Sequence, residues 1–316
     1  MDITVILCTY NRSQALSKTL ESLAASELPE SVNWEVLVVD NNSSDQTRDA
    51  VEGFCRRHPD RFRYLFEPHQ GKSYALNAGI REARGGILAF VDDDLTVDPS
   101  WLQNLTAPLN GGVWAGVGGR TLLARPYSPP RWLALQGPYS MGGIVAALLD
   151  LGDTPRELDR APYGSNMAFR KEMFEKYGDF RTDLGPSPNH EIPRPNEDTE
   201  FGRRLMAAGE HLRYEPSAVV YHPISEDRVK KEYFLNWSFD YGRAFVREWR
   251  HGSPVLGIPR GYLSILKLAV TRMADGIWRW TLALDPQRKF FWKCRVWFIA
   301  GQIKEFYRFA RNIQTM

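Results

Sequence analysis

The sequence contains few cysteines and no cysteine motif. Cys8, Cys55 and Cys294 are the only three in 316 residues, and none is in a CxxC spacing. An odd number of widely separated cysteines argues against a disulfide framework and against a thiolate zinc site. Free thiols of this kind indicate a reducing compartment, so we expect a cytoplasmic protein.

The sequence also has no long hydrophobic run. The longest stretch without a charged residue, 101–119, contains Pro108 and five glycines, and the uncharged stretch 132–149 is also interrupted by glycine and proline. A membrane-spanning helix needs about 20 predominantly apolar residues. The apolar run Ile3–Cys8 is short and has no basic residues before it. We therefore expect neither a spanning helix nor a signal peptide.

The chain as a whole has little net charge, but its N-terminal and C-terminal parts differ in the sign of their charge. The net charge is +2, yet residues 1–225 carry 23 basic and 30 acidic side chains, whereas residues 226–316 carry 17 and 8. This asymmetry predicts two domains, 1–225 and 226–316. With 43% apolar residues the chain is globular rather than disordered, and no nucleic-acid-binding motif is present, so we expect no nucleic-acid partner.

The first hundred residues alternate between two periodicities. Short β-rich apolar runs predict strands at Ile3–Cys8, Trp34–Val39, Phe62–Phe66 and Ile87–Val91. Helical patterns lie between them, at 11–28, 45–57 and 73–83. Polar residues follow the strands. This order predicts an α/β protein with a Rossmann-like, mostly parallel central sheet flanked by helices.

The later part of the chain is less regular. We expect strands at Val113–Val117 and Ala218–Tyr221, and a helix at Thr199–Ala208 preceded by Asn196 as its cap. Prolines between 186 and 195 exclude a helix interior there. Beyond Ser225 the pattern becomes long, basic and aromatic-rich helices, which form a C-terminal helical extension.

Asp92, Asp93 and Asp94 form the strongest single chemical signal. They follow the apolar strand 87–91 directly. Three adjacent carboxylates repel one another, and a hard divalent cation such as Mn²⁺ or Mg²⁺ would offset their charge. The structural alternative is an acidic turn that faces water.

Four other polar positions each have two interpretations. Glu197 and Asp198 open a helix, where the helix dipole favours carboxylates, but Asp198 could also accept a proton. Lys72 could contact a phosphate or be an ordinary exposed lysine. Asp40 could bind a nucleotide or form a turn, and His222 could be a metal ligand or a core residue.

Taken in order, these segments resemble family-2 glycosyltransferases. The resemblance covers about residues 3–225 and rests on seven segments: Val5–Arg12, Val38–Asp45, Gly71–Ile80, Phe90–Asp94, Gly164–Arg170, Glu197-Asp198 and His222. Members of that family are inverting, metal-dependent enzymes with a DxD motif and the GT-A fold, so the resemblance implies that fold and a nucleotide-sugar donor, commonly a UDP-sugar.

The resemblance also implies roles for individual residues. Asp94, Asp92 and His222 would hold Mn²⁺ or Mg²⁺, and Asp198 would be the catalytic base. The residues implied to bind the nucleotide or donor are Thr9, Tyr10, Arg12, Asp40, Lys72, Asp92 and Asp93. Those implied to lie near the donor sugar and acceptor are Gly164, Ser165, Asn166 and Glu197.

Two alternatives to this function remain open at the level of sequence. One is a non-catalytic sugar- or nucleotide-binding protein of the same fold. The other is a sugar-nucleotide pyrophosphorylase, although its glycine-rich N-terminal signature is replaced by Leu7–Arg12. The acceptor would be a glycan or a lipid-linked glycan in polysaccharide or glycolipid assembly.

The C-terminal segment 260–316 has two interpretations as well. Basic residues among Trp and Phe are typical of a helix that lies on an anionic membrane surface, here the inner face of the plasma membrane. Alternatively, its apolar side packs on the catalytic domain or forms an oligomer interface.

Overall fold

The computed structural model describes residues 2–188, 192–250 and 262–314. The chain divides into two compact units. The first, here called the sheet unit, comprises Met1–Arg125, Ala147–His190 and Glu197–Pro223. The second, the helical unit, comprises Pro126–Ala146, Glu191–Asn196 and Ile224–Met316. The division between units near residue 224 lies beside the boundary expected at 225, but the helical unit also includes two earlier segments.

The first half of the sheet consists of four parallel strands. They are β1 (Ile3–Thr9), β2 (Trp34–Asp40), β3 (Phe62–Phe66) and β4 (Ile87–Val91), in the spatial order β3-β2-β1-β4. Every residue of β2 is buried, which explains the apolar run Val36–Val39, and the buried Glu35 is paired with Arg63 of β3 at 2.7 Å. The polar residues that follow these strands therefore emerge at one edge of the sheet.

The second half of the sheet is mixed. Beyond β4 come β8 (Asn166–Arg170), β6 (Gly116–Leu123), β9 (Leu212–His222) and β5 (Thr96–Val97), and β7 (Arg156–Glu157) pairs with β9. β8 is antiparallel to β4 and β6, whereas β6 and β9 are parallel. Because β6 and β9 are parallel, the carboxyl end of β9, at His222, lies beside the carboxyl end of β6.

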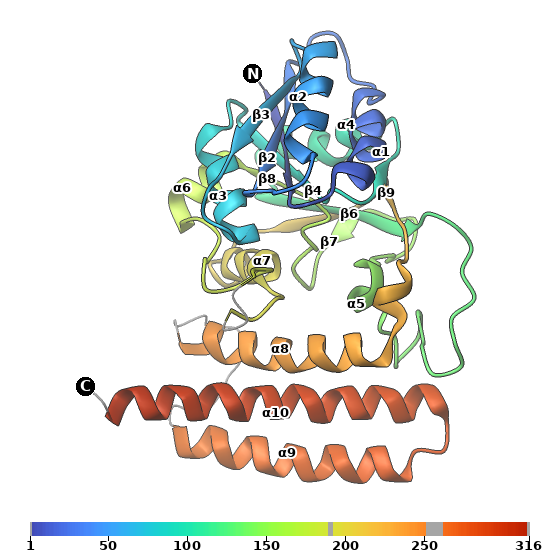
Figure 1. Ribbon diagram of the computed structural model, residues 1–316, viewed down its shortest axis with the longest axis vertical. Helices are drawn as coiled ribbons and strands as arrows, with labels where there is room; N and C mark the ends of the chain where they lie inside the picture. The colour runs from blue at the N-terminus through green and yellow to red at the C-terminus, as the bar shows by residue number, and fades with distance from the viewer. Residues whose placement is uncertain (1, 189–191, 251–261, 315–316) are drawn as a thin grey trace. The chain divides into compact units, whose positions relative to one another are not determined.

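Helices cover both faces of the sheet (Figure 1). Side chains from α1 (Ser13–Ala24), α2 (Thr47–Arg57) and α4 (Trp101–Thr106) pack in one core, which continues into the short 3₁₀ turn Ala107–Gly111. Side chains from α3 (Lys72–Glu82), α6 (Lys171–Tyr177) and α7 (Glu197–Ala207) pack in the other. Alternate residues of β1 and β2 supply the two cores, as the two-residue period of a strand requires.

Two strand predictions differ from the structure in their limits. Strand β6 begins at Gly116 rather than at Val113, and the Val113 side chain is 66% exposed. Strand β9 begins six residues earlier than expected, at Leu212. The register between β6 and β9 shifts after Gly119, where Glu215 is followed by Val219 as the next paired residue. Pro216 lies in this bulge and interrupts the strand pattern in the sequence.

The helical unit contains α5 (Gly142–Ala146), the 3₁₀ turn Glu226–Val229, α8 (Lys231–Arg250), α9 (Tyr262–Leu282) and α10 (Pro286–Gln314). α10 lies between α8 and α9 (Figure 1). Two glycines permit close contact of α8 and α10: a Cβ atom on Gly242 would collide with the Phe298 carbonyl, and one on Gly301 with the Phe239 carbonyl. Within the described ranges, no helix is both long enough and apolar enough to cross a membrane.

Candidate functional site

Three potential metal ligands come together at the ends of β4 and β9. One ligand atom each from Asp92, Asp94 and His222 lie within 4.8 Å of one another. Asp92 and Asp94 are half-buried and His222 is buried, since β9 places it beside the loop that follows β4. Two carboxylates and one imidazole form a donor set that fits a divalent cation such as Mn²⁺, with coordination positions left for other oxygen ligands.

The orientation of the His222 ring supports this fit. Its Nδ1 atom lies 2.7 Å from the Pro223 carbonyl oxygen, which can only accept, so Nδ1 donates. Its Nε2 atom lies 3.5 Å from Asp94 Oδ1. A bond from Nδ1–H to a carbonyl is the arrangement that fixes a metal-binding histidine and turns Nε2 toward the ion. Nε2 and the carboxylate therefore face a shared position that either a proton or a cation can occupy.

Lys72 links this cluster to the first turn of α7. Its Nζ atom lies 2.7 Å from Asp92 Oδ1 and 3.7 Å from Glu197 Oε1. Burial alone would lower the pKa of Lys72, but the negative charges of Asp92 and Glu197 outweigh it and raise the pKa well above its ordinary value. Lys72 is thus a fixed cation held between two carboxylates, not a freely exposed lysine.

Glu197 and Asp198 have different environments although they are adjacent. Burial raises the pKa of Glu197 to about 8, and the negative charge of Asp198 adds to the effect. Asp198 accepts hydrogen bonds from the Gly164 amide at 2.6 Å (Oδ2) and from the Thr199 amide at 2.6 Å (Oδ1). A side chain at position 164 would crowd the Asp198 carboxylate, because a Cβ atom there would lie 3.0 Å from Oδ2. The loop 164–166 therefore orients Asp198.

The other two residues of that loop differ in role. The Asn166 side chain is buried, accepts a hydrogen bond from the Trp101 indole at 2.8 Å and donates to the Arg120 and Ala218 carbonyls at 3.0 Å each. Its polar atoms are used inside the sheet. The hydroxyl of Ser165, in contrast, is buried and has no hydrogen-bond partner within the described part of the protein.

The residues implied to bind a nucleotide follow β1 and β2. Thr9 is buried, whereas the Tyr10 ring is 42% exposed. Arg12 Nη1 lies 3.7 Å from Asp94 Oδ2, so the β1 loop reaches the metal-ligand cluster. The buried Asp40 accepts hydrogen bonds from the Ser43 amide at 3.0 Å and the Tyr64 hydroxyl at 2.9 Å. Both carboxylate oxygens of Asp40 therefore accept hydrogen bonds from within the protein.

Asp93 lies between the two candidate ligands. It is half-buried, and its burial raises its pKa to about 6, with the negative charge of Asp94 as the next cause. Uptake of a cation beside it would oppose this effect, because a positive charge favours the ionised carboxylate.

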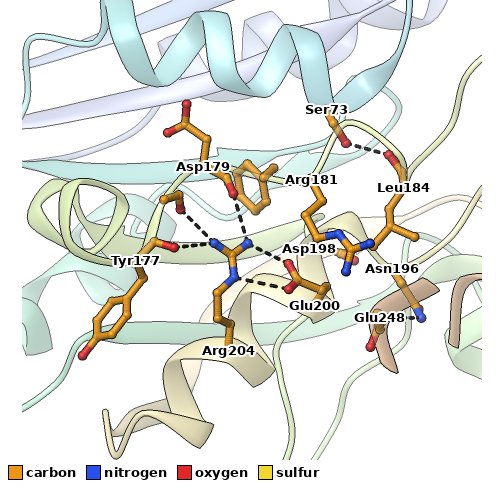
Figure 2. Close-up of polar contacts among 12 residues, drawn as sticks. Ser73, Tyr177, Asp179, Arg181, Leu184, Asn196, Asp198, Glu200, Arg204 and Glu248 are labelled. Carbon is orange, nitrogen blue, oxygen red and sulfur yellow. Dashed lines mark hydrogen bonds and ion pairs between the residues drawn. The ribbon is translucent and has the colours of Figure 1, made fainter. Parts of the chain in front are cut away.

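Two features of this region were not evident in the sequence. The segment 180–186 runs along α3: Ser73 Oγ donates to the Leu184 carbonyl at 2.8 Å, and the Lys72 amide donates to the Pro186 carbonyl at 2.8 Å. Figure 2 shows the second feature, Arg204 of α7. It donates to the Glu200 carboxylate and to the carbonyls of residues 177–179, which ties α7 to the end of α6. Backbone acceptors leave no sequence pattern, so neither contact could have been found there.

The fold and the polar cluster together define the class. This is an α/β protein whose functional groups lie beyond the carboxyl ends of adjacent strands, where such folds bind nucleotides. Residues 4–178 match the family described as Glycosyl transferase family 2. The chain belongs to this family and is a glycosyltransferase.

Curated relatives agree with this assignment. The succinoglycan biosynthesis protein ExoM of Rhizobium meliloti (strain 1021) is 31% identical over 258 residues, which cover 80% of this chain and 77% of that protein. The glycosyltransferase AglE of Haloferax volcanii is 28% identical over 250 residues, which cover 78% and 74% respectively. The resemblance seen in the sequence is confirmed, and the two alternatives, a non-catalytic protein and a pyrophosphorylase, are set aside.

Solved structures share the fold. The mannosyltransferase PcManGT from Pyrobaculum calidifontis, solved in complex with GDP-Man and Mn²⁺, has a TM-score of 0.64 at 20% identity and covers 97% of this chain and 87% of its own. GalNAc-T7, solved with UDP, GalNAc and Mn²⁺, has a TM-score of 0.56 at 15% identity and covers 77% of this chain and 48% of its own. The predicted GT-A fold with C-terminal helices is confirmed.

Proposed function

We propose that this glycosyltransferase moves a sugar from a nucleoside-diphosphate donor, a UDP-sugar, to an acceptor hydroxyl with inversion at the anomeric carbon. The convergence of Asp92, Asp94 and His222 within 4.8 Å is the observation that carries the proposal. A carboxylate and imidazole site of this kind suits Mn²⁺ or Mg²⁺ beside a diphosphate. The neighbour PcManGT was solved with Mn²⁺ and a nucleotide sugar, which supports the same assignment here.

Each residue then has a defined task. Asp92, Asp94 and His222 would hold the cation, which when bound would act as a Lewis acid and offset the negative charge of the leaving diphosphate. Lys72 fixes the orientation of Asp92 through their 2.7 Å contact. Asp198 accepts the proton of the attacking acceptor hydroxyl, and the Gly164 amide holds its carboxylate in place. Attack from the side opposite the leaving group inverts the anomeric centre without an enzyme nucleophile.

The donor nucleotide would lie beyond β1 and β2. Thr9, Tyr10 and Arg12 line this part, and the exposed ring of Tyr10 offers a surface on which a base can stack. Asp40 would accept a hydrogen bond from the base in addition to those that it already accepts from Ser43 and Tyr64.

The donor sugar and the acceptor would lie near α7 and the loop 164–166. Ser165 is the best-placed member of that loop because its buried hydroxyl has no hydrogen-bond partner among the described residues. Gly164, Asn166 and Glu197 shape the same region, and Asp93 is proposed to contact the sugar. We assign Asn166 to positioning, since its side chain holds β6 and β9.

We further propose a glycan or lipid-linked acceptor, used in polysaccharide or glycolipid assembly on the inner face of the plasma membrane. One relative in Haloferax volcanii, 27% identical over 248 residues, is named as a glucosyl-dolichyl phosphate glucuronosyltransferase, and another as a succinoglycan biosynthesis protein. The basic segment 260–316 would provide contact with anionic lipid.

A donor screen tests the transfer. The full chain is incubated with Mn²⁺ and each of a set of UDP-sugars and GDP-mannose, and release of the nucleoside diphosphate is measured. Release from a UDP-sugar that disappears in Asp94→Asn but persists in Asp60→Asn, an exposed carboxylate elsewhere, supports the proposal. Release from GDP-mannose alone would refute the UDP assignment, and equal release by both variants would refute the metal site.

A further inference from the structure

Helix α9 has an apolar outer face. The side chains of Val270, Ile277, Trp278 and Leu282 are 55%, 42%, 60% and 60% exposed, and Leu284, two residues beyond the helix end, is 97% exposed. At 100° per residue the four helix positions fall within an arc of about 140° on one side of the helix. Ala274, Thr281 and the exposed Lys267 and Thr271 lie in the same arc, so the apolar side chains of this face surround one basic residue.

The opposite side of α9 explains why this face is left outside. Ala269, Gly276 and Ala283 recur every seven residues and are all buried. Gly276 faces α10, where an added Cβ atom would lie 3.2 Å from Val296 Cγ2, and Ala269 belongs to a small core with Phe298 and Ile299 of α10. Small residues bring the two helices close together. The large apolar side chains of α9 therefore lie on the side that α10 does not cover.

The aromatic residues of α10 are used differently. Phe290 packs edge-on against Trp132, with ring centroids 4.6 Å apart, and Phe298 packs on Tyr241 at 5.2 Å. Trp297 contacts Trp280 of α9 at 6.4 Å. The aromatic residues of α9 and α10 therefore differ in their environment. Phe290, Trp297 and Phe298 of α10 pack inside the helical unit, whereas Trp278 of α9 and Tyr307 of α10 are exposed.

The charges of α9 and α10 are mainly positive. Residues 262–314 contain ten Lys and Arg but only three acidic residues. Of these acids, Asp275 is paired with Arg279 at 2.8 Å, and the fully buried Glu305 is held by Arg243 and Arg247 at 3.0 and 2.8 Å. The third, Asp285, is exposed, and its carboxylate accepts a hydrogen bond from the Arg288 amide at 2.7 Å. Arg288 and Lys289 are exposed, four and five residues after Leu284. An apolar face with exposed basic residues at its end complements an anionic lipid surface.

We propose that the outer face of α9 is the surface through which this protein binds an anionic lipid bilayer, with Trp278 and Leu284 in the interface between headgroups and acyl chains. The inference rests on the membrane contact proposed above and assigns it to one helix face. A bilayer fits better than a second copy of the chain. A twofold interface would place each basic surface against itself, whereas anionic headgroups attract it.

Vesicle binding by the full chain tests the assignment. Sedimentation is measured with vesicles of phosphatidylcholine alone and of phosphatidylcholine mixed with phosphatidylglycerol. We expect binding to the mixed vesicles only, and its loss in high salt. The double variant Ile277→Ser/Trp278→Ser should bind at least about tenfold more weakly because it removes two apolar side chains from the bilayer. The variant Arg288→Glu/Lys289→Glu should lose about fivefold or more per charge.

Matched controls carry the same changes on the sheet unit. Val113→Ser alters an apolar side chain that is 66% exposed, and Arg56→Glu reverses an exposed charge at the end of α2. Both should bind vesicles like the unchanged protein. All variants should release nucleoside diphosphate normally without lipid, because none of the changed residues belongs to the candidate site.

The possible failures are distinct. No binding of the unchanged protein to anionic vesicles would refute membrane contact altogether. Equal binding by Ile277→Ser/Trp278→Ser would refute the assignment to α9 alone. A dimer in light scattering that this variant converts to a monomer, with vesicle binding intact, would assign the face to a second copy. None of these results bears on the transfer reaction, which is measured without lipid.

Discussion

Lys72 Nζ lies 2.7 Å from Asp92 Oδ1 and 3.7 Å from Glu197 Oε1. The three residues come from the start of α3, the end of β4 and the start of α7. One cation therefore connects the candidate metal site with the helix that carries the proposed base. This relationship also explains why two carboxylates can lie close together in a largely buried position.

Above pH 8, where Glu197 is ionised, replacing Lys72 by methionine should destabilise the protein by about 2 kcal/mol, because Asp92 and Glu197 would lose their shared counter-charge. Removal of one partner from a fully buried pair costs about 3–5 kcal/mol, and Lys72 keeps some contact with solvent. Urea unfolding measures the change. Lys176→Met is the matched control, since Lys176 is 61% exposed in its 2.9 Å contact with Glu210 and its loss should have little effect on stability. Adding Glu197→Gln to Lys72→Met should recover part of the loss. Equal small effects at both lysines would contradict the role given to Lys72.

Metal binding should be visible without any activity assay. Mn²⁺ at about 100 times its dissociation constant would stabilise the folded state by about 2.7 kcal/mol, which corresponds to a rise in Tm of roughly 4 °C for a chain of this size. Thermal unfolding with Mn²⁺ and then with excess chelator measures the rise and its reversal. Asp94→Asn and His222→Gln should each remove most of it, whereas Asp60→Asn should keep it. A full rise in Asp94→Asn would place the ion elsewhere.

The buried Glu197 should make stability depend on pH. Its pKa is about 8 in the folded protein, against 4.5 for the ordinary side chain. Between these values the folded state holds a proton that the unfolded state releases, so stability falls as the pH rises from about 4.5 to about 8. Glu197→Gln cannot release this proton and should show a flatter profile in urea midpoints measured across that range. Glu30→Gln, at an exposed position, should follow the unchanged protein. Parallel profiles for Glu197→Gln and the unchanged protein would exclude Glu197 as the titrating group.

Gly242 and Gly53 offer a direct comparison within helices. Alanine is favoured over glycine in a helix interior by about 1 kcal/mol, so Gly53→Ala in α2 should stabilise; the nearest atom to its Cβ would be Arg56 Nη2 at 3.7 Å. Gly242→Ala should instead destabilise by about 1–3 kcal/mol, because its Cβ would collide with the Phe298 backbone and push α8 away from α10. Thermal unfolding of both variants measures the two signs. Stabilisation by Gly242→Ala would mean that α8 and α10 do not pack this closely.

The sequence was sufficient to predict the first half of the sheet. Buried parallel strands are largely apolar and are followed by polar residues, and β1, β2 and β4 fit that rule, whereas β3 contains Arg63 and is only partly buried. The second half could not be predicted to the same extent, because β9 contains Pro216 and a bulge, and β6 begins with glycines. Strand pairing across such irregularities depends on partners that are distant in the sequence.

The candidate site shows a similar limit. The family resemblance implies Asp92, Asp94 and His222 as metal ligands, each of them follows or ends a strand, and the structure brings the three together. The environment of Lys72 was not predictable, because its partner Glu197 is 125 positions away in the chain. Asn166 was grouped with ligand-contacting residues by motif alone, whereas its hydrogen bonds lie within the sheet. A motif identifies which residues matter but not whether a side chain faces the ligand or the fold.

Asp198 and Glu200 lie within one turn of α7, and we expect a catalytic role for Asp198 and a structural role for Glu200. Asp198→Asn keeps an oxygen that can accept from the Gly164 amide but cannot take up the acceptor proton, so kcat should fall by about 10²–10⁴-fold while donor binding is unchanged. Glu200→Gln weakens the contact with Arg204, which lies 2.7 Å away, and should lower the free energy of unfolding with little effect on kcat. Steady-state kinetics, nucleotide binding and urea unfolding of both variants separate the two roles. Full transfer activity in Asp198→Asn would rule out Asp198 as the base, and the hydroxyl proton would then need another acceptor beside the metal cluster.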